Sequence, residues 1–429
     1  MKTLLKGGCV LTLDRRTGNL PRGDVLIVDG RVGEIGENLR ARDAEVIDCA
    51  DTIVMPGFVD AHRHTWRSLF RNAGTDAAGQ TILATEHREH HQPDDIYGAT
   101  LIGLLGAAGS GTTTVVDWAD IPRSAEHVDA ALQAHADAGV RTVFVHPVAT
   151  AAEVPTGRFE PDGLSRLAIG GCDPLDSNAD KVATEWGLAR SLGLRVHVHA
   201  GTTASRDAIA ALGKAGLLGD DVTLVHGTNL SDPDLDAVAA SGATIAVTPS
   251  TEMASGLGSP PIQQFIDRDI EPGLGVDDES LAPGDLLAQM RATISIQHAT
   301  LFEAKLAGKA GVPKLMTTRE VIRHGTIDGA RAAGLDSITG TLSVGKQADV
   351  IVLRTDRPNI YPINDPIGAV VWGMDTSNLD SVFVSGRPLM RNGALAADVI
   401  RARALATAAQ RRVATAAGVL TPSHHGGSQ

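Results

Sequence analysis

The feature that most constrains the fold is a repeated alternation of short apolar runs with Ala-rich helical stretches from residue 56 to residue 340. Eight of these runs have the length and composition of strands. They cover residues 57–61, 112–117, 141–146, 166–170, 195–199, 222–226, 244–247 and 273–276. Helical segments such as 128–138, 181–192 and 233–240 lie between most of them. Eight strand-then-helix units fit a (β/α)8 barrel, which typically needs about 250 residues plus insertions.

The two ends of the chain have a different pattern, because short strands there are separated by turns. Residues 1–55 contain runs at 10–13, 24–28, 31–35 and 45–54, with a hairpin signal at Asp29-Gly30. Residues 341–397 return to strands, and 398–429 form a helix up to about residue 417 followed by a polar tail that we expect to be disordered. We therefore predict an α/β chain. Its TIM-like barrel, 56–340, is joined to a composite β-sandwich built from both chain ends.

Composition excludes several classes of partner. The chain has 38 Lys and Arg against 51 Asp and Glu, so its net charge is −13, and only 3% of its residues are aromatic. An acidic chain with few aromatic residues is a poor binder of nucleic acid or anionic membranes. No apolar run reaches the ~20 residues of a membrane span, and the N-terminus has no signal-peptide pattern. Three cysteines give no disulfide framework. We expect a cytoplasmic protein with a small-molecule substrate and leave a homo-oligomer open.

Histidines lie at the ends of the first and fifth predicted strands. The catalytic residues of such a barrel lie at the C-terminal ends of its strands. His62 and His64 are two residues apart at the end of the first strand, so their rings point to the same face. His199 ends the fifth strand, and His197 would lie one layer deeper as a hydrogen-bonded or core residue. Converging imidazoles are half of a metal site.

Two further strand ends carry polar residues that suit hydrolysis. His226 ends the sixth strand, and Asp277 directly follows the eighth. A carboxylate can bind a metal through one oxygen and accept a proton through the other. A metal with open positions lowers the pKa of bound water from 15.7 toward about 7. The pattern therefore indicates hydrolysis by a metal-activated water.

Several segments together resemble the amidohydrolase superfamily. They are PGFVDAHRH at 56–64, the histidine ending strand five, His226 and GLGVDD at 273–278. The chain is most similar to the branch of cytosine deaminase, S-adenosylhomocysteine deaminase and triazine hydrolase. GDVLIVDGRVGEIG near the start and GTLSVGKQADVIVL after the barrel look like the two halves of the family's β-sandwich.

The resemblance implies roles for these residues. His62, His64, His199 and Asp277 would bind one divalent metal ion, with zinc expected first and Fe2+ or Mn2+ as alternatives. His226 would polarise the substrate or the attacking water, and Asp277 would also shuttle a proton. Binuclear members bridge two metals with a lysine on strand four. No lysine occurs between Lys6 and Lys181 here, which favours a single metal.

One position departs from the family pattern. Deaminases of this branch usually carry a glutamate three residues after the strand-five histidine, where this chain has Thr202. A threonine hydroxyl cannot act as a general acid near neutral pH. Glu252, just past strand seven, could supply the proton, or it could be an ordinary loop or helix-start carboxylate.

Aromatic and histidine residues near the barrel mouth leave further alternatives open. Trp66 and Trp118 could stack on a flat substrate, beside Thr202, or could simply pack. His87 could pair with His90 or His91 as a second metal site, or these residues could form a solvated rim helix.

Together these observations predict a hydrolase of carbon–nitrogen bonds other than peptide bonds. The expected substrate is a small, flat nitrogen heterocycle, attacked in a deaminase-like reaction. The alternatives are hydrolysis of an exocyclic amide or of a ring substituent such as halide, and a barrel that binds a ligand without turnover. The substrate itself, the choice of metal and the oligomeric state do not follow from the sequence.

Overall fold

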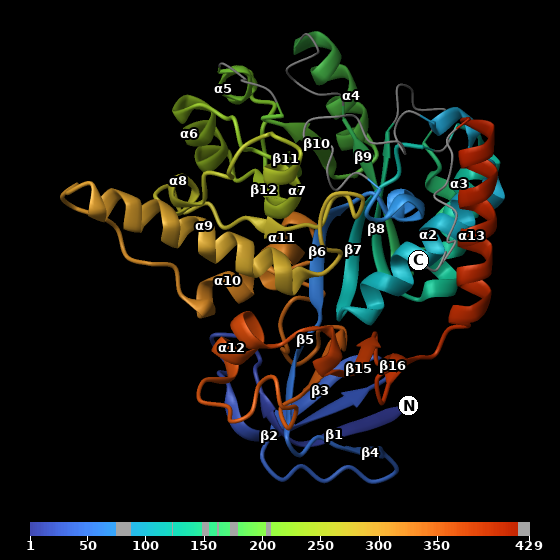
Figure 1. Ribbon diagram of the computed structural model, residues 1–429, viewed down its shortest axis with the longest axis vertical. Helices are drawn as coiled ribbons and strands as arrows, with labels where there is room; N and C mark the ends of the chain where they lie inside the picture. Colours follow the sequence, from blue (N-terminus) through green and yellow to red (C-terminus); the bar gives the residue numbers. More distant parts are fainter. Residues whose placement is uncertain are drawn as a thin grey trace, which may run out of the picture.

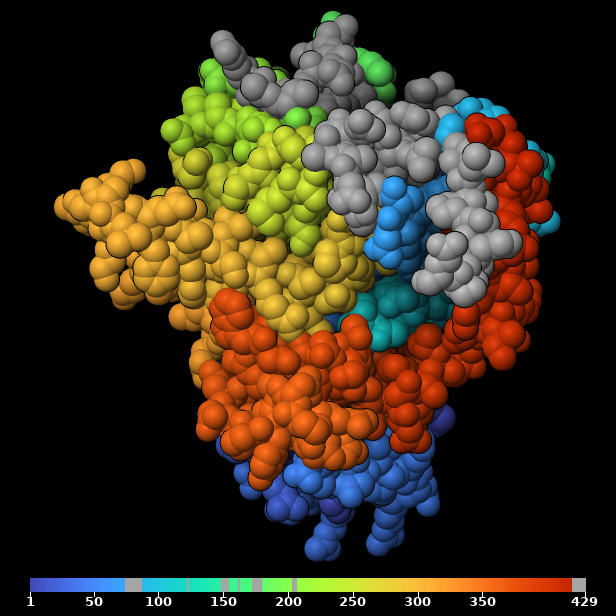
Figure 2. Space-filling model, in the orientation of Figure 1, coloured from blue at the N-terminus to red at the C-terminus, as the bar shows by residue number. Residues whose placement is uncertain are grey.

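The computed structural model describes residues 1–73, 87–121, 123–147, 154–160, 163–171, 179–202 and 207–418. It contains an eight-stranded parallel sheet and a separate nine-stranded mixed sheet. Figure 1 shows the parallel sheet surrounded by helices and the mixed sheet at the other end of the molecule. Figure 2 shows segments from both ends of the chain packed against each other at that end of the molecule.

The parallel sheet is a nearly closed barrel whose strands follow chain order. Its strands are β6 (Phe58–Arg63), β7 (Thr112–Trp118), β8 (Arg141–Pro147), β9 (Ser165–Gly170), β10 (Val196–Ala200), β11 (Val222–His226), β12 (Thr244–Val247) and β13 (Gly273–Leu274). A parallel bridge between Arg63 and Asp277 joins the first strand to the chain just beyond the last one. The predicted barrel is therefore confirmed, and each strand boundary lies within two residues of the predicted one.

Helices connect the strands and continue after β13. They are α2 (Pro93–Gly109), α3 (Ala125–Ala138), α4 (Ala179–Ser191), α5 (Ala208–Lys214), α6 (Asp232–Ser241), α7 (Pro249–Ala254), α8 (Ile262–Ile266), α9 (Leu286–Leu306), α10 (Thr318–His324) and α11 (Ile327–Ala332). Local sequence explains the ends of α6. Ser231 caps its first turn in a reciprocal capping box with Asp234, and Gly242 ends it with φ of 77°.

The mixed sheet is built from both chain ends. Its strands are β1 (Lys2–Val10), β2 (Leu20–Val28), β3 (Arg31–Gly36), β4 (Glu45–Asp48), β5 (Thr52–Pro56), β14 (Val350–Arg354), β15 (Leu379–Val384), β16 (Arg387–Arg391) and β17 (Ala394–Leu395). β5 pairs antiparallel with β14, so the two halves form one continuous sheet. The hairpin at Asp29-Gly30 is present. The N-terminal stretch forms a strand as expected, but the part predicted at 11–13 is wrong, since β1 ends at Val10.

The long C-terminal helix α13 and several short helical turns complete the described chain. They are α12 (Pro366–Gly368), α13 (Val399–Ala416), the 3-10 turns η1 (Thr65–Phe70), η2 (Arg88–His90), η4 (Thr156–Arg158) and η6 (Thr376–Asn378), and a π-helical turn η5 (Ala369–Gly373). Helix α13 packs along α2, where Arg412 pairs with Asp95. The tail predicted to be disordered lies outside the described residues. Within the described part of the chain, no helix is long and apolar enough to cross a membrane.

Candidate active site

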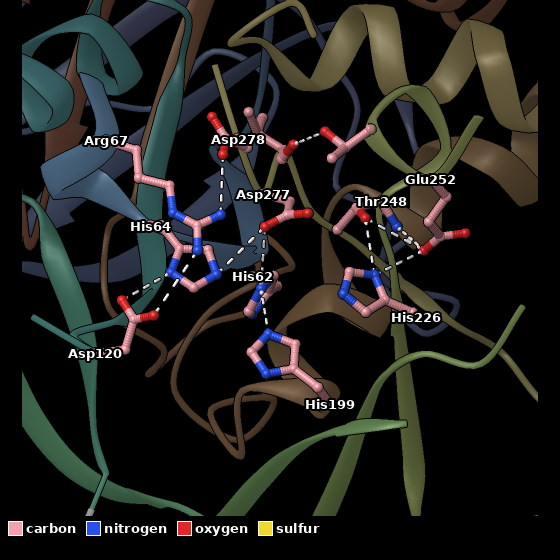
Figure 3. Close-up of polar contacts among 12 residues, drawn as sticks. His62, His64, Arg67, Asp120, His199, His226, Thr248, Glu252, Asp277 and Asp278 are labelled. Atoms are coloured by element: carbon pink, nitrogen blue, oxygen red, sulfur yellow. Dashed lines mark hydrogen bonds and ion pairs between the residues drawn. The ribbon is translucent and has the colours of Figure 1, made fainter. Parts of the chain in front are cut away.

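Four predicted metal ligands converge at the C-terminal ends of the barrel strands (Figure 3). Oδ1 of Asp277 lies 3.4 Å from Nε2 of His62 and 3.4 Å from Nε2 of His64. Nε2 of His199 lies 3.3 Å from Nε2 of His62. His226 offers a nitrogen within 4.8 Å of the donor atoms of His62 and His199, so it borders the same cluster.

The protonation states of these residues suit a divalent cation. Burial lowers the pKa of His62 to about 4 and also lowers the pKa of His199, so both imidazoles are neutral at neutral pH. Burial alone would raise the pKa of Asp277, but its hydrogen bond with His62 and the neighbouring histidines hold that pKa well below its usual value. Neutral imidazoles and an ionised carboxylate are the donors that zinc and similar ions prefer. The cluster therefore fits such an ion.

Asp120 supports the cluster from behind, and the sequence analysis missed it. Its Oδ1 lies 3.2 Å from Nδ1 of His64 and accepts a 2.7 Å hydrogen bond from Nε1 of Trp66. Its Oδ2 accepts a 2.8 Å bond from Arg88. Burial opposes its ionisation, yet His64 and the two nearby arginines, Arg67 and Arg88, hold the pKa of Asp120 well below its usual value. A carboxylate behind a ligand histidine fixes the ring's orientation and tautomer.

Trp66 occupies a different place from the one predicted. Its side chain is 1% exposed, and its indole N–H is taken up by Asp120. It does not line the pocket in front of the cluster. The geometry gives Trp66 the task of holding Asp120, and the predicted stacking on a substrate loses its support.

Glu252 lies behind His226. Its Oε1 is 3.3 Å from Nδ1 of His226 and accepts a 2.8 Å bond from the backbone N–H of Thr248. Its Oε2 accepts a 2.7 Å bond from the hydroxyl of Thr228. The Glu252 side chain on α7 is 0% exposed and does not line the pocket, so the suggestion that it donates a proton directly to a substrate is not supported.

This carboxylate changes the acidity of His226. Burial opposes protonation of the ring, but the hydrogen bond to Glu252 and the charges of Asp277 and Glu252 outweigh it and raise the pKa of His226. With Nδ1 facing Glu252, the other ring nitrogen is the one left to face the pocket. The arrangement therefore favours the protonated form of this histidine.

A pocket of about 1060 Å³ opens in front of the cluster. Trp118, at the end of β7, lines it with its ring centroid 4.1 Å from that of His199. His146 from β8 and Glu185 from α4 add two further titratable side chains to the lining. Thr202 is partly exposed and is not among the lining residues. Of the predicted substrate contacts, the structure therefore brings only Trp118 to the pocket.

Backbone geometry next to the metal donors requires special residues. A Cβ at Gly275 would lie 2.6 Å from the carbonyl oxygen of His62, so only glycine permits this approach. His226 and Asp277 have φ of 77° and 64°, in the left-handed region that non-glycine residues rarely adopt. Such backbone strain is concentrated at functional sites.

Comparison with known proteins agrees with this geometry. The sequence model of the amidohydrolase family matches residues 53–389. The 5'-deoxyadenosine deaminase of Methanothermobacter thermautotrophicus is 26% identical over 411 residues, covering 88% of this chain and 91% of the relative. The 5-methylthioadenosine/S-adenosylhomocysteine deaminase of Pyrococcus furiosus is 26% identical over 424 residues, covering 91% and 95%.

Solved structures share the fold. An adenosine deaminase from Xanthomonas campestris with bound zinc has a TM-score of 0.82 at 20% identity, covering 96% of this chain and 98% of that one. A variant of atrazine chlorohydrolase from Arthrobacter aurescens, in complex with zinc and atraton, has a TM-score of 0.81 at 22% identity, covering 95% and 100%. Since the family match spans well over half of the sequence, the chain belongs to the amidohydrolase family, and its prediction as a hydrolase of carbon–nitrogen bonds is confirmed.

Proposed function

We propose that the protein is a mononuclear metal-dependent hydrolase that removes the exocyclic amine of a substituted nitrogen heterocycle. The observation that carries the proposal is the convergence of three histidines and one aspartate at the barrel mouth. Oδ1 of Asp277 lies 3.4 Å from Nε2 of both His62 and His64, and Nε2 of His199 lies 3.3 Å from that of His62. The relatives named for 5'-deoxyadenosine and 5-methylthioadenosine make an adenine nucleoside the first substrate class to test. A pocket of about 1060 Å³ is large enough for a heterocycle with a sizeable substituent.

In this proposal His62, His64, His199 and Asp277 hold one ion, and zinc is the first candidate. When bound, a divalent cation at these donors supplies the Lewis acidity that makes water a competent nucleophile at neutral pH. Strand β9 has the sequence SRLAIG and contains no lysine that could bridge a second ion. This composition supports a count of one. The three cysteines support a reducing, cytoplasmic compartment.

The chain's own residues divide the proton transfers between them. The depressed pKa of Asp277 keeps its carboxylate ionised, ready to accept a proton from the nucleophile. His226, whose pKa is raised, offers a proton or a hydrogen bond to the substrate atom that becomes negative. Glu252 positions the His226 ring through Nδ1. Trp118 supplies an aromatic wall for a flat ring.

The absence of a glutamate at position 202, where this chain has Thr202, favours a second candidate reaction. A ring that must be protonated before attack needs an acid, which a threonine hydroxyl cannot be near neutral pH. Substrates whose carbon is already electrophilic, such as a halogen-bearing triazine, need no such acid. The structural likeness to atrazine chlorohydrolase shows only the fold, but it makes this class worth testing beside the nucleosides.

The test is a parallel screen of hydrolysis by the zinc-loaded protein. The panel would contain 5'-deoxyadenosine, 5-methylthioadenosine, S-adenosylhomocysteine, cytosine, an aminotriazine and a chlorotriazine. Ammonia release, chloride release and product mass identify which bond breaks. The Asp277→Asn variant, prepared in the same way, is the control for contaminating activity. Turnover of an aminated ring that is lost in this variant supports deamination, whereas chloride release alone would favour the second candidate. The proposal would be contradicted if the protein does not retain zinc after loading and dialysis. It would also be contradicted if turnover of every compound equals that of the Asp277→Asn variant.

A further inference from the structure

One histidine motif, EHREHH at residues 86–91, lies outside the cluster at the barrel centre. The side chains of His87, Glu89 and His90 each offer a donor atom, and these atoms lie within 4.8 Å of one another. His91 takes no part, because it is buried and its Nδ1 lies 3.1 Å from the carbonyl oxygen of His87. The structure therefore pairs His87 with His90 and adds a carboxylate that the sequence analysis did not consider.

We propose that His87, Glu89 and His90 form a second, accessory metal site for a transition-metal ion of the Zn2+, Ni2+ or Cu2+ class. Two imidazoles and one carboxylate are donors for these ions, whereas Mg2+ and Ca2+ prefer an all-oxygen site. The 3-10 turn η2 begins directly after His87, and the ring centroids of His87 and His90 lie 5.9 Å apart. The side chains of His90 and Glu89 are 30% and 57% exposed, so an ion can enter from solvent and keep water in its remaining positions.

The backbone of this turn is held in place before any ion binds. The N–H of His90 donates to the carbonyl of His87 at 3.1 Å, and Arg123 donates to the carbonyl of Glu89 at 2.7 Å. Arg88, between the donors, reaches the other way and donates to Asp120 at 2.8 Å. A site on a preorganised turn loses less conformational entropy when it binds.

The same arginines set a limit on affinity. Arg88 and Arg123 carry positive charge beside the donors, and Glu89 is exposed while His87 and His90 are half-buried. The neighbouring positive charge and the exposure of Glu89, whose counterparts His62, His64 and Asp277 are buried, weaken the binding of a cation. We therefore expect the accessory ion to bind more weakly than the ion held by His62, His64, His199 and Asp277, so that dialysis removes it first.

The site lies at the rim of the catalytic pocket. Arg88 and Arg123 both line that pocket, and Arg88 bonds the carboxylate of Asp120 that supports His64. An ion on the flanking side chains would restrain the segment that carries Arg88. The accessory site is thus connected to the catalytic centre through Arg88 and Asp120 and does not depend on which substrate the enzyme hydrolyses.

The test measures metal binding to the holoenzyme directly. Protein loaded with zinc and dialysed would be titrated with Zn2+ or Ni2+ in a calorimeter, with total metal measured by elemental analysis. We expect one further, weaker equivalent. His87→Ala and His90→Ala should each weaken it at least about tenfold, since even residues that only support a ligand change metal affinity 10–100-fold. The tightly held equivalent should remain in both variants.

Two controls keep the result specific. His424 and His425, in the tail beyond the described residues, are the other adjacent histidine pair that could bind Ni2+, so a double alanine variant there must retain the weaker equivalent. Glu89→Gln keeps the size of the side chain and should weaken binding while leaving the circular dichroism spectrum unchanged. The proposal is overturned if the wild-type holoenzyme binds no further equivalent, if that equivalent survives in the His87→Ala/His90→Ala double variant, or if the tail variant removes it.

Discussion

The most informative single substitution is Glu252→Gln, because it removes one charge behind His226 and little else. Glutamine has nearly the size of glutamate, and its amide oxygen can still accept the 2.8 Å bond from the backbone N–H of Thr248. The bond between Oε1 and Nδ1 of His226 at 3.3 Å changes from a charge-assisted bond to a neutral one. Both side chains are buried, so bulk water does not screen the difference.

The magnitude follows from the strength of that bond. Hydrogen bonds to charged groups contribute about 1.5–3 kcal/mol and neutral ones about 0.5–1.5 kcal/mol, a difference of roughly 1–1.5 kcal/mol. Burial opposes protonation of His226, and Glu252 is the first of the groups that raise its pKa in spite of burial. The protonated form is present below this raised pKa and is lost as the pH rises through it. Without the charge of Glu252, the proton is lost about one pH unit earlier.

If protonated His226 assists the reaction, kcat at neutral pH should fall about tenfold, and the alkaline limb of the kcat profile should move toward lower pH. The assay is kcat against pH with the best substrate of the screen, with metal content measured on the same samples. Thr228→Val is the matched control, because it removes a 2.7 Å bond to the other carboxylate oxygen and leaves the charge in place. It should move the limb far less. Unchanged kcat with an unmoved limb in Glu252→Gln would refute the role given to His226, as would loss of the metal.

Three further substitutions test the cluster itself. His199→Ala should abolish tight metal binding while His197→Ala keeps it, as measured by elemental analysis after dialysis, since His199, and not His197, has a donor atom within 4.8 Å of those of both His62 and His226; the reverse result would move the ligand one layer deeper. Asp120→Asn should weaken metal retention about 10–100-fold in competition with a chelator, because its carboxylate holds Nδ1 of His64; unchanged retention would make Asp120 a packing residue. Gly275→Ala should lower the free energy of unfolding by about 1–3 kcal/mol, and lower the thermal midpoint even in metal-free protein, because its Cβ would lie 2.6 Å from the carbonyl oxygen of His62. An unchanged midpoint would show that the contact between residue 275 and β6 can relax.

Much of the barrel and its donors could be predicted because both depend on local patterns. Short apolar runs of regular spacing identify parallel strands, and residues at their C-terminal ends meet at one rim whatever the loops do. A two-residue spacing places the rings of His62 and His64 on one face without knowledge of the tertiary structure. The strands of the mixed sheet could be predicted from the same kind of pattern. The end of β1 was predicted too late, because an apolar run can continue several residues past the paired segment.

The supporting roles of Asp120 and Glu252 could not be predicted, because their partners are distant in the sequence. Asp120 lies 56 residues from His64, and Glu252 lies 26 residues from His226. Neither carboxylate has a spacing that distinguishes it from a solvated side chain. The choice between stacking and packing for Trp66 stayed open for the same reason, since a tryptophan near a barrel mouth has no local feature that shows whether its indole N–H is already bonded. For Asp120, the sequence offered one signal: this residue lies two positions after the end of strand β7, at the rim where catalytic residues gather.

The same backbone contacts close the barrel and place one of the metal donors in this chain. Strand β13 ends at Leu274, two residues before the predicted end, because the chain then turns toward β6. Asp277 donates its N–H to the carbonyl of His62 at 2.9 Å, and its own carbonyl accepts the N–H of His64 at 3.0 Å. These two backbone bonds fix the aspartate between the two histidines independently of any side chain. A donor substitution such as Asp277→Asn should therefore change metal binding and leave the seam closed. Gly275→Ala strains the seam itself, so it should change stability and metal binding together.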